Sequence, residues 1–229
     1  MTALGPRERD HAVPPDFDRL REAMVERQIR ARGVTTPRVL QAMRRVHRER
    51  YVPPQFVKRA YEDSALPIEE RQSISQPYIV ALMLDMLGLC GDERVLEIGT
   101  GSGYAAAVLA ELAREVYTIE RHERLARTAA DRLAHDGYSS VHVRHGDGTL
   151  GWPEQAPFGA IVVAAAGPSV PEALCQQLAI GGRLVMPVGE GAGGQRLERI
   201  TRTAPDKFTH ESLASVRFVP LVGPQGLRE

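Results

Sequence analysis

Short β-prone runs alternate with amphipathic stretches through the second half of this chain. Five runs have the length and the β-branched content of buried strands: Val95–Ile98, Val116–Ile119, Val141–Arg144, Ala160–Val163 and Arg183–Met186. Three stretches between them have a helical pattern: Ala105–Ala113, Glu123–His135 and Pro171–Leu178. Strands that alternate with helices predict βαβ units and a parallel sheet.

The first part of the chain has a different, purely helical pattern. Apolar residues between Phe17 and Arg32 recur at roughly helical spacing, with arginines and glutamates between them. Pro37 can open a second helix, and the pattern over Gln76–Leu87 predicts a third. We therefore expect a helical elaboration in front of the sheet.

The two ends and one loop complete the expected organisation. Residues 1–16 are polar and lack a period, which predicts a disordered tail. The runs Leu197–Thr203 and Leu213–Val222 predict an antiparallel pair that closes the sheet. The glycine-rich stretch 189–194 predicts a flexible loop.

The composition excludes several classes of protein. Of the 229 residues, 43% are hydrophobic and 25% are charged, which is ordinary for a soluble globular protein. The formal net charge is zero, whereas proteins that bind nucleic acids or membrane surfaces carry a basic excess. The longest uncharged apolar run, Ala160–Ala166, is too short to span a bilayer, and no apolar signal segment follows Met1. We expect a cytoplasmic protein with no nucleic-acid or membrane partner.

Cysteine and histidine usage argues against a disulfide framework and against a metal site. Cys90 and Cys175 are too few for such a framework and lack the spacing of metal ligands, so we expect both to be small buried residues. His142 and His145 lie near each other without a third ligand in the sequence nearby. The prediction is therefore that the protein holds no metal ion.

The most informative motif is Glu-Ile-Gly-Thr-Gly-Ser-Gly at 97–103, between a predicted strand and a predicted helix. A dinucleotide site needs Gly-x-Gly-x-x-Gly, but here the third glycine comes one residue early and Tyr104 takes its place. An acid before the loop repels a diphosphate and suits a cationic ligand, such as the sulfonium and amino groups of S-adenosylmethionine. The alternative is a tight turn and nothing more. The residues expected at the cofactor are Glu97, Gly99, Thr100, Gly101, Ser102 and Gly103.

Further acids follow the next two predicted strands. A carboxylate at Glu120 can accept hydrogen bonds from both ribose hydroxyls, and Asp147 can accept one from an adenine amino group. Gly148 leaves room for the adenine ring. Because ligands of such sheets bind at the carboxyl ends of the strands, these positions are expected to meet at one site.

A second block, Gln72-Ser73-Ile74-Ser75-Gln76-Pro77-Tyr78, precedes a predicted helix start. One interpretation is that a serine caps this helix. That interpretation explains Ser73 or Ser75 but not the cluster of uncharged donors with both glutamines. Such a cluster suits recognition of a carboxylate or an amide.

Five blocks of the chain, in order, resemble the protein-L-isoaspartate O-methyltransferases: Ile74–Tyr78, Val95–Tyr104, His145–Gly148, Pro187–Gly189 and Arg217–Leu221. The likeness runs from about Leu20 to Gly223. It implies a cytosolic repair enzyme that uses S-adenosylmethionine to methylate the free carboxyl group of isoaspartyl residues, and D-aspartyl residues as a further acceptor, in damaged proteins.

The resemblance also assigns a fold and residue roles. It implies a Rossmann-like class I methyltransferase in one domain over residues 17–229, with a helical part at 17–90 and a mostly parallel seven-stranded sheet at 91–229. The family's active-site serine falls on Ser75, and no catalytic histidine or lysine is expected. The implied cofactor contacts are Gln72, Ser73, Ile74, Ser75, Glu97, Gly99, Thr100, Gly101, Ser102, Gly103, Glu120, Asp147 and Gly148. The implied substrate contacts are Ser75, Gln76, Tyr78 and Val219.

The chain departs from the family pattern on the substrate side. The family usually has Gly-x-Gly-Gln-Thr where this chain has Glu-Glu-Arg-Gln-Ser at 69–73. If the lost glycines had positive φ, this loop is expected to take another path. Ala164 stands where threonine is common, and His47 stands where proline is common.

Three functions stay open at this point. The first is isoaspartyl repair by a monomeric enzyme acting on damaged peptides and proteins. The second is a carboxyl methyltransferase for another aspartyl peptide or a small acid, which Glu69 and Arg71 keep open. The third is a catalytically silent module that binds S-adenosylmethionine, against which the intact Ser75 and Glu97 argue. Fold alone cannot separate them.

Overall fold

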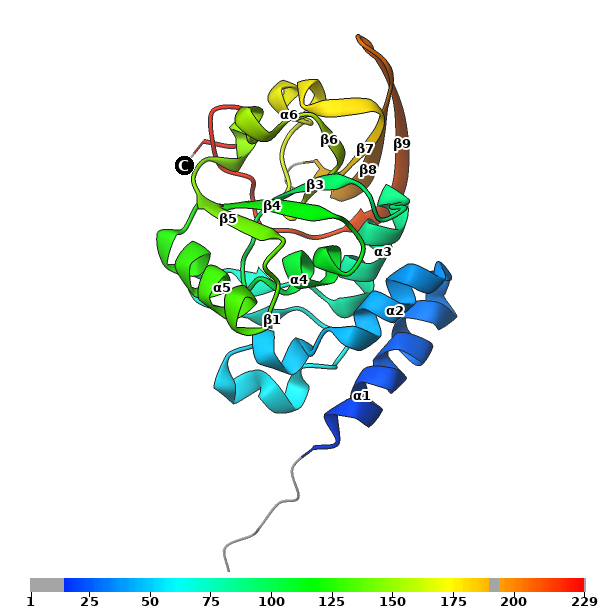
Figure 1. Cartoon of the computed structure of the whole chain (residues 1–229), viewed down its shortest axis with the longest axis vertical. Coiled ribbons are helices and arrows are strands. Elements are labelled where there is room, and N and C mark those ends of the chain that lie inside the picture. The colour runs from blue at the N-terminus through cyan, green and yellow to red at the C-terminus, as the bar shows by residue number, and fades with distance from the viewer. Residues whose placement is uncertain (1–14, 190–193, 229) are drawn as a thin grey trace, which may run out of the picture.

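A seven-stranded sheet forms the centre of the molecule (Figure 1). The computed structural model describes residues 15–189 and 194–228. The strands lie in the order β5-β4-β3-β6-β7-β8-β9, the first five parallel and the last two antiparallel. Their bounds are β3 Arg94–Ile98, β4 Glu115–Glu120, β5 Val141–His145, β6 Phe158–Val163, β7 Leu178–Val188, β8 Gln195–Ala204 and β9 Lys207–Val216. The predicted mostly parallel sheet of seven strands is confirmed.

Helices cover both faces of this sheet. On one face lie α3 Pro77–Leu87, α4 Tyr104–Ala110 and α5 Glu123–His135, with the N-terminal helices packed below them (Figure 1). The opposite face is covered by α6 Glu172–Gln176 and by the 3₁₀ segments Gly148–Leu150 and Pro153–Gln155. Each face therefore has its own hydrophobic cluster.

Residue parity along β3 assigns side chains to these two clusters. Val95 packs on the α3 and α4 side, whereas Leu96 and Ile98 pack on the α6 side, and all three are buried. Successive side chains of a strand point to opposite faces, so Glu97 is directed to the same side as Val95. Burial of such apolar side chains stabilises the fold by about 1.5–3 kcal/mol each.

The N-terminal layer consists of short helices: α1 Phe17–Ala23, a π-helix Met24–Ile29, 3₁₀ segments Arg30–Arg32, Arg48–Tyr51 and Pro54–Arg59, and α2 Pro37–Arg45. A short antiparallel pair, β1 Leu66–Pro67 with β2 Ser73–Ile74, links this layer to α3. The helical pattern from Phe17 is confirmed, but the segment is not one regular helix. Met24 and Ile29 are five residues apart and both buried, a spacing that fits the i→i+5 bonding of a π-helix.

Three predicted elements end earlier than expected. The helix predicted to reach Ala113 ends at Ala110. The helix predicted to reach Leu178 ends at Gln176, since Leu178 already pairs with Phe158 in the sheet. The strand predicted to reach Val222 ends at Val216. Beyond it, the Gln195 side chain accepts a hydrogen bond from Phe218 N at 2.6 Å, which draws the backbone out of the ladder.

Three other expectations are settled only in part or are wrong. Cys90 is exposed and Cys175 half-buried, because Cys90 lies in the turn between α3 and β3 and Cys175 lies on a short surface helix. The predicted tail lies outside the described residues up to position 14, while Asp16 caps α1 by accepting from Arg19 N at 3.0 Å. Most of the predicted 189–194 loop lies outside the described residues as well.

Candidate active site

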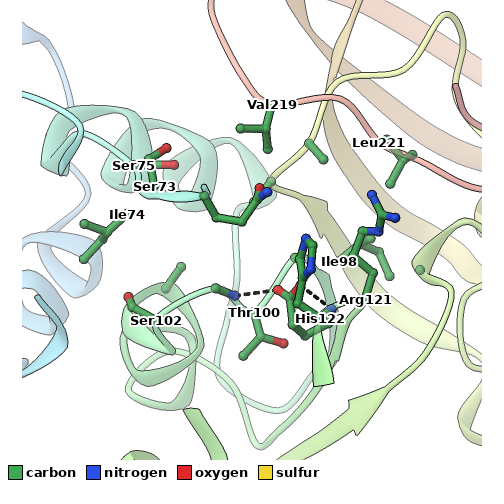
Figure 2. A pocket seen from close by; sticks show the side chains of 18 of the residues that line it. Ser73, Ile74, Ser75, Ile98, Thr100, Ser102, Arg121, His122, Val219 and Leu221 are labelled. Carbon is green, nitrogen blue, oxygen red and sulfur yellow. Dashed lines mark hydrogen bonds between the residues drawn. The ribbon is translucent and has the colours of Figure 1, made fainter. Parts of the chain in front are cut away.

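A pocket lies where β3 and β6 diverge. From β3 the chain proceeds to β4 and β5 on one side, and β6 and β7 lie on the other, so the strand order reverses at this point. Such a switch point leaves a crevice beyond the carboxyl ends of the strands. Residues from the loops after β3, β4 and β6, from the segment before α3 and from the C-terminal segment line the pocket (Figure 2). The predicted convergence at the carboxyl ends is therefore observed for most of the candidate residues.

The glycine loop after β3 forms the floor of the pocket. Gly99, Gly101 and Gly103 have φ of 94°, 53° and 89°, values that side chains with a Cβ rarely adopt. Gly99 and Gly101 line the pocket together with Thr100 and Ser102. A Cβ on Gly103 would instead lie 3.4 Å from Ala129 and Leu133 of α5. The third glycine thus allows α4 to approach α5, and the structure does not place it on the pocket wall.

Glu120 forms one end of the pocket and is held by the backbone. Its Oε2 accepts from Gly101 N at 2.9 Å and its Oε1 accepts from His122 N at 3.0 Å (Figure 2). Only 4% of the residue is exposed. Each carboxylate oxygen can accept a second hydrogen bond, so the fixed side chain can still bind two hydroxyl groups.

Glu97 lies beneath the glycine loop and does not line the pocket. Its Oε2 accepts from Thr118 Oγ1 at 2.5 Å, and Thr118 Oγ1 lies 2.6 Å from Thr100 Oγ1, so a chain of hydroxyls joins the acid to the pocket floor. Its Oε1 is buried without a hydrogen-bond partner in the described residues. Burial, with a smaller contribution from the nearby Glu120, raises the pKa of Glu97 to about 8, although the Thr118 bond opposes this. The acid is therefore protonated at neutral pH in this state.

Asp147 and Gly148 lie beside the main pocket. The Asp147 Oδ1 accepts from Thr149 N at 2.9 Å and from Thr149 Oγ1 at 2.8 Å, which fixes the loop after β5. Asp147 lines an adjoining hollow that shares Arg121 and Val222 with the main pocket. Gly148 lines the main pocket, and a Cβ there would lie 2.3 Å from Ile98 Cγ2. Glycine is therefore required at 148 for packing as well as for space.

The segment before α3 forms the wall opposite Glu120. Gln72, Ser73, Ile74 and Ser75 all line the pocket, and Figure 2 shows the two serines beside it. Ser75 does not cap α3, because the N-cap residue is Gln76 and no side-chain bond caps this helix. The cluster is thus left with the ligand-binding interpretation.

Two predicted substrate contacts are engaged elsewhere. Gln76 Nε2 donates to Asp63 O at 3.0 Å, and the ring of Tyr78 has the Arg32 guanidinium 3.4 Å from its centroid. Neither residue is among those that line the pocket, although both flank Ser75. The structure places them outside the pocket wall.

The loop that lacks the family's glycines has a left-handed backbone at two residues. Glu70 and Arg71 have φ of 55° and 56°, although both carry side chains. The expectation of a different path is conditional on positive φ at the family's glycines, and it stays a prediction. A left-handed backbone at a residue with a side chain stores strain of about 1–3 kcal/mol. Both side chains are exposed beside Gln72.

The C-terminal segment covers the pocket from above. Ala166 N donates to Val219 O at 2.8 Å and Leu221 N donates to Ala166 O at 2.7 Å, so the segment is tied to the loop after β6. Of the residues that this segment contributes to the pocket, only Val219 was predicted.

Over the whole pocket, sequence reasoning missed twelve lining residues: Val80, Ile98, Tyr104, Ala105, Ile119, Arg121, His122, Ala164, Ala165, Pro220, Leu221 and Val222. The rule that ligands meet strand ends could have found those that end or follow β3, β4 and β6.

The arrangement can bind a polar ligand with its reactive part shielded from water. A fixed carboxylate lies at one end, serine hydroxyls lie at the other, and apolar side chains such as Ile74, Ile98 and Leu221 lie between them. Within residues 15–189 and 194–228, no group of three His, Cys, Asp or Glu side chains is placed to hold a metal ion. In the same part of the chain, no helix is both long and apolar enough to cross a membrane.

Comparison with known sequences shows a single family over nearly the whole chain. The model of the family "Protein-L-isoaspartate(D-aspartate) O-methyltransferase (PCMT)" matches residues 19–226. The chain is 60% identical over 210 residues to protein-L-isoaspartate O-methyltransferase 1 of Rhodopseudomonas palustris (strain HaA2), covering 92% of this chain and 86% of that protein. It is 56% identical over 211 residues to protein-L-isoaspartate O-methyltransferase 2 of Marinobacter nauticus, covering 92% and 96% respectively.

Comparison with solved structures agrees. A protein-L-isoaspartate O-methyltransferase with 28% sequence identity matches with a TM-score of 0.81, over 90% of this chain and 67% of that one. A Plasmodium falciparum protein assigned to the same family, solved in complex with S-adenosyl-L-homocysteine, matches with a TM-score of 0.77 and 24% identity, over 88% and 98% of the two chains. The second match shows the fold, which is that of class I methyltransferases.

The raised pKa of Glu97 predicts a pH-dependent stability in the absence of cofactor. The unfolded chain ionises this acid near pH 4.5, while the folded chain keeps it protonated to about pH 8, so its contribution to stability falls as the pH rises between these values. We expect Glu97→Gln to gain stability over the wild type by up to about 1.4 kcal/mol per pH unit in this window. Urea unfolding of both proteins at pH 5.5 and 7.5 measures this difference in unfolding free energy. A stability difference between the two proteins that stays constant with pH would contradict the assignment.

Proposed function

The chain belongs to the protein-L-isoaspartate(D-aspartate) O-methyltransferase family, and from this premise we propose how its pocket carries out the family's reaction. The protein is a methyltransferase that uses S-adenosyl-L-methionine. It esterifies the free carboxyl group of L-isoaspartyl residues in damaged proteins, and we include D-aspartyl residues as further acceptors. The roles of individual residues, given below, are our proposal.

We propose that the cofactor lies across the glycine loop, with its ribose at Glu120. The Glu120 carboxylate is already oriented by two backbone N–H groups and retains free lone pairs for the ribose hydroxyls. Asp147, at the adjoining hollow, and Gly148, on the wall of the main pocket, suit the adenine. When bound, S-adenosylmethionine supplies a methyl group on a sulfonium sulfur, which keeps the electron pair of the broken C–S bond.

Glu97 fits this cofactor through an unusual feature. Its Oε1 is a buried polar atom without a partner in the part of the chain that the structure describes, under the loop that a cationic ligand would cover. A positive charge placed nearby favours the ionised form of a buried acid. Thr118 and Thr100 connect Glu97 to the pocket floor. We propose that, through these hydrogen-bonded hydroxyls, the acid stabilises the bound cation electrostatically.

We propose that Ser75 orients the acceptor carboxyl group. The Gln72–Ser75 segment and Val219 form the wall and the roof at this end of the pocket, with Gln76 and Tyr78 flanking Ser75 for the rest of the peptide. A carboxyl group with a pKa of about 3.5–4 is already an anion at neutral pH, so no general base is needed. The chain has only to hold the acceptor oxygen in line and exclude water, which the apolar walls can do.

The product accounts for repair without further catalytic groups. A methyl ester expels methoxide more readily than a carboxylate expels oxide. The neighbouring backbone nitrogen can therefore attack the ester carbonyl and close a succinimide ring, and the methoxide leaves with the N–H proton as methanol. Hydrolysis of the succinimide then yields normal aspartate in part of the molecules. No side chain of this protein is required for these later steps.

One observation carries the proposal: a single pocket joins the fixed carboxylate of Glu120 to the serine cluster at Ser75 (Figure 2). The two motifs are 45 positions apart in the chain, yet they lie on opposite walls. A pocket for a cofactor alone would not need the second wall of hydroxyl groups. We also propose one methyltransferase domain over residues 17–229, acting as a monomer in the cytoplasm without nucleic-acid or membrane partners.

The left-handed loop at Glu70 and Arg71 supports a second candidate function. Strain of this kind gathers at ligand sites, and these exposed side chains flank the acceptor wall. The acceptor in this alternative is an aspartyl side chain of a particular peptide or a small acid. The same chemistry would serve it, with a different fit beside Ser75.

Methyl transfer from labelled S-adenosylmethionine to two matched peptides tests the function. The peptides differ only in isoaspartate against aspartate at one position. We expect label on the isoaspartyl peptide alone, since the wall at Ser75 must distinguish the two backbones. No label on either peptide, with cofactor binding confirmed, would refute repair and favour the alternative acceptor.

Two substitutions separate the two ends of the pocket. Ser75→Ala is expected to lower the methylation rate by about 10- to 100-fold through loss of acceptor orientation, with cofactor affinity within about twofold. Glu120→Ala is expected to weaken cofactor binding by about tenfold or more, since two charge-assisted hydrogen bonds are lost. Calorimetry and initial rates measure both effects. Full activity of Ser75→Ala, or unchanged affinity of Glu120→Ala, would remove that residue from its role.

A further inference from the structure

Arg48 lies behind the acceptor wall and belongs to none of the roles assigned so far. It opens the 3₁₀ segment Arg48–Tyr51 in the N-terminal layer, and its side chain is fully buried. An arginine is almost never buried in this way unless a partner compensates its charge. The contacts of this residue therefore need an explanation.

Its hydrogen bonds lead directly to the acceptor side of the pocket. Nε donates to Ala60 O at 2.8 Å and Nη2 donates to Ser75 O at 2.8 Å. The guanidinium also lies over the ring of Tyr104, 4.7 Å from its centroid, a cation–π contact with a residue that lines the pocket. Arg48 thus touches two lining residues from behind.

The charge of Arg48 is not paired within the described part of the chain. Its Nη1 is buried there without a hydrogen-bond partner, and no carboxylate of residues 15–189 or 194–228 lies within ion-pair distance of the guanidinium. The neighbouring Glu49 is engaged by Tyr61 and His47 instead. Burial lowers the pKa of Arg48, but a guanidinium stays protonated in proteins. A positive charge therefore lies against the backbone carbonyl of Ser75, the residue whose hydroxyl we place at the acceptor.

We propose that Arg48 is a positioning residue for the acceptor, holding Ser75 in place and attracting the carboxylate of the substrate with its unpaired charge. This inference rests on the proposed function, which places an anionic acceptor at Ser75. A buried cation without a counter-ion is costly, and an incoming anion reduces that cost. The chain thereby favours the ionised acceptor over a neutral group of the same shape.

A purely structural role would not require this charge. Linking the carbonyl groups of Ala60 and Ser75 requires two hydrogen-bond donors. A neutral side chain can supply part of this. Apolar replacement of a buried ion is often tolerated by folds. The preference of the pocket for an anion therefore distinguishes the two roles, because hydrogen bonds that only link Ala60 and Ser75 would not affect that preference.

The test compares an isoaspartyl peptide with its isoasparaginyl counterpart, in which a neutral carboxamide replaces the acceptor carboxylate. Binding of each peptide to the protein saturated with S-adenosylhomocysteine is measured by calorimetry. Arg48→Met and Arg48→Gln remove the charge, and Gln keeps one donor nitrogen, with two N–H groups, in case the Met variant does not fold. Arg45→Met is the matched control, because Arg45 is an exposed arginine paired with Glu111.

We expect the wild type and Arg45→Met to prefer the anionic peptide by about tenfold or more, and both Arg48 variants to lose at least about fivefold of that preference. The affinity for the neutral peptide should change by less than about twofold. Equal weakening of both peptides would reduce Arg48 to a structural role and overturn the inference. An unchanged preference would overturn it as well.

The outcomes separate this inference from the proposed function. A wild type that neither binds nor methylates the isoaspartyl peptide would refute both. A wild type that methylates it, with the full preference kept in the Arg48 variants, would refute the inference alone. If neither neutral variant folds, Arg48→Lys decides, since it keeps the charge but has a different donor geometry. A retained preference with a lower kcat supports the inference, and a lost preference overturns it.

Discussion

The divergence of β3 and β6 is the constraint on which the rest of the pocket depends. The ladder between them reaches Ile98 and Val163, and the chain then turns away on both sides, with Ala164 N still donating to Ile98 O at 2.8 Å. The turn frees backbone N–H groups that would otherwise pair within the sheet. One of them, on Gly101, fixes Glu120. The left-handed glycines are the means by which the chain makes this turn in so few residues.

Two buried acids and a buried arginine give the pocket two chemically different sides. Glu97 and Glu120 lie under and beside the glycine loop, and Arg48 lies behind Ser75. A sulfonium cofactor suits the first side and a carboxylate acceptor suits the second. Neither Glu97 Oε1 nor Arg48 Nη1 has a hydrogen-bond partner among the described residues, and both residues lie directly behind residues that line the pocket.

Most of the sheet could be predicted from the sequence, because period and composition act locally. Four of the five predicted parallel strands end within two residues of their observed bounds, while β7 is longer than expected because its first residue pairs separately before a bulge. The π-helix at Met24–Ile29 depends on the tertiary packing of Met24 and Ile29, and local helix propensity does not predict such packing. The path of the chain after β9 depends on Gln195, whose side chain binds the backbone of Phe218, a residue distant in sequence.

The site could be predicted in outline but not in the direction of its side chains. Strand ends and glycines located Glu120 and the loop, whereas Glu97 lies under the loop because parity turns it to the α4 side. Gln76 and Tyr78 follow Ser75 but are directed to Asp63 and Arg32. Arg48 gave no signal in the sequence, since one arginine among many reveals its role only through burial.

The most direct measurement of the central claim is a crystal structure of the protein with S-adenosylhomocysteine and an isoaspartyl peptide bound together. One pocket is claimed to hold cofactor and acceptor between Glu120 and Ser75. We predict the ribose at Glu120 and the peptide carboxylate at Ser75, facing the cofactor sulfur. A peptide bound on another face, or a ribose away from Glu120, would contradict the claim.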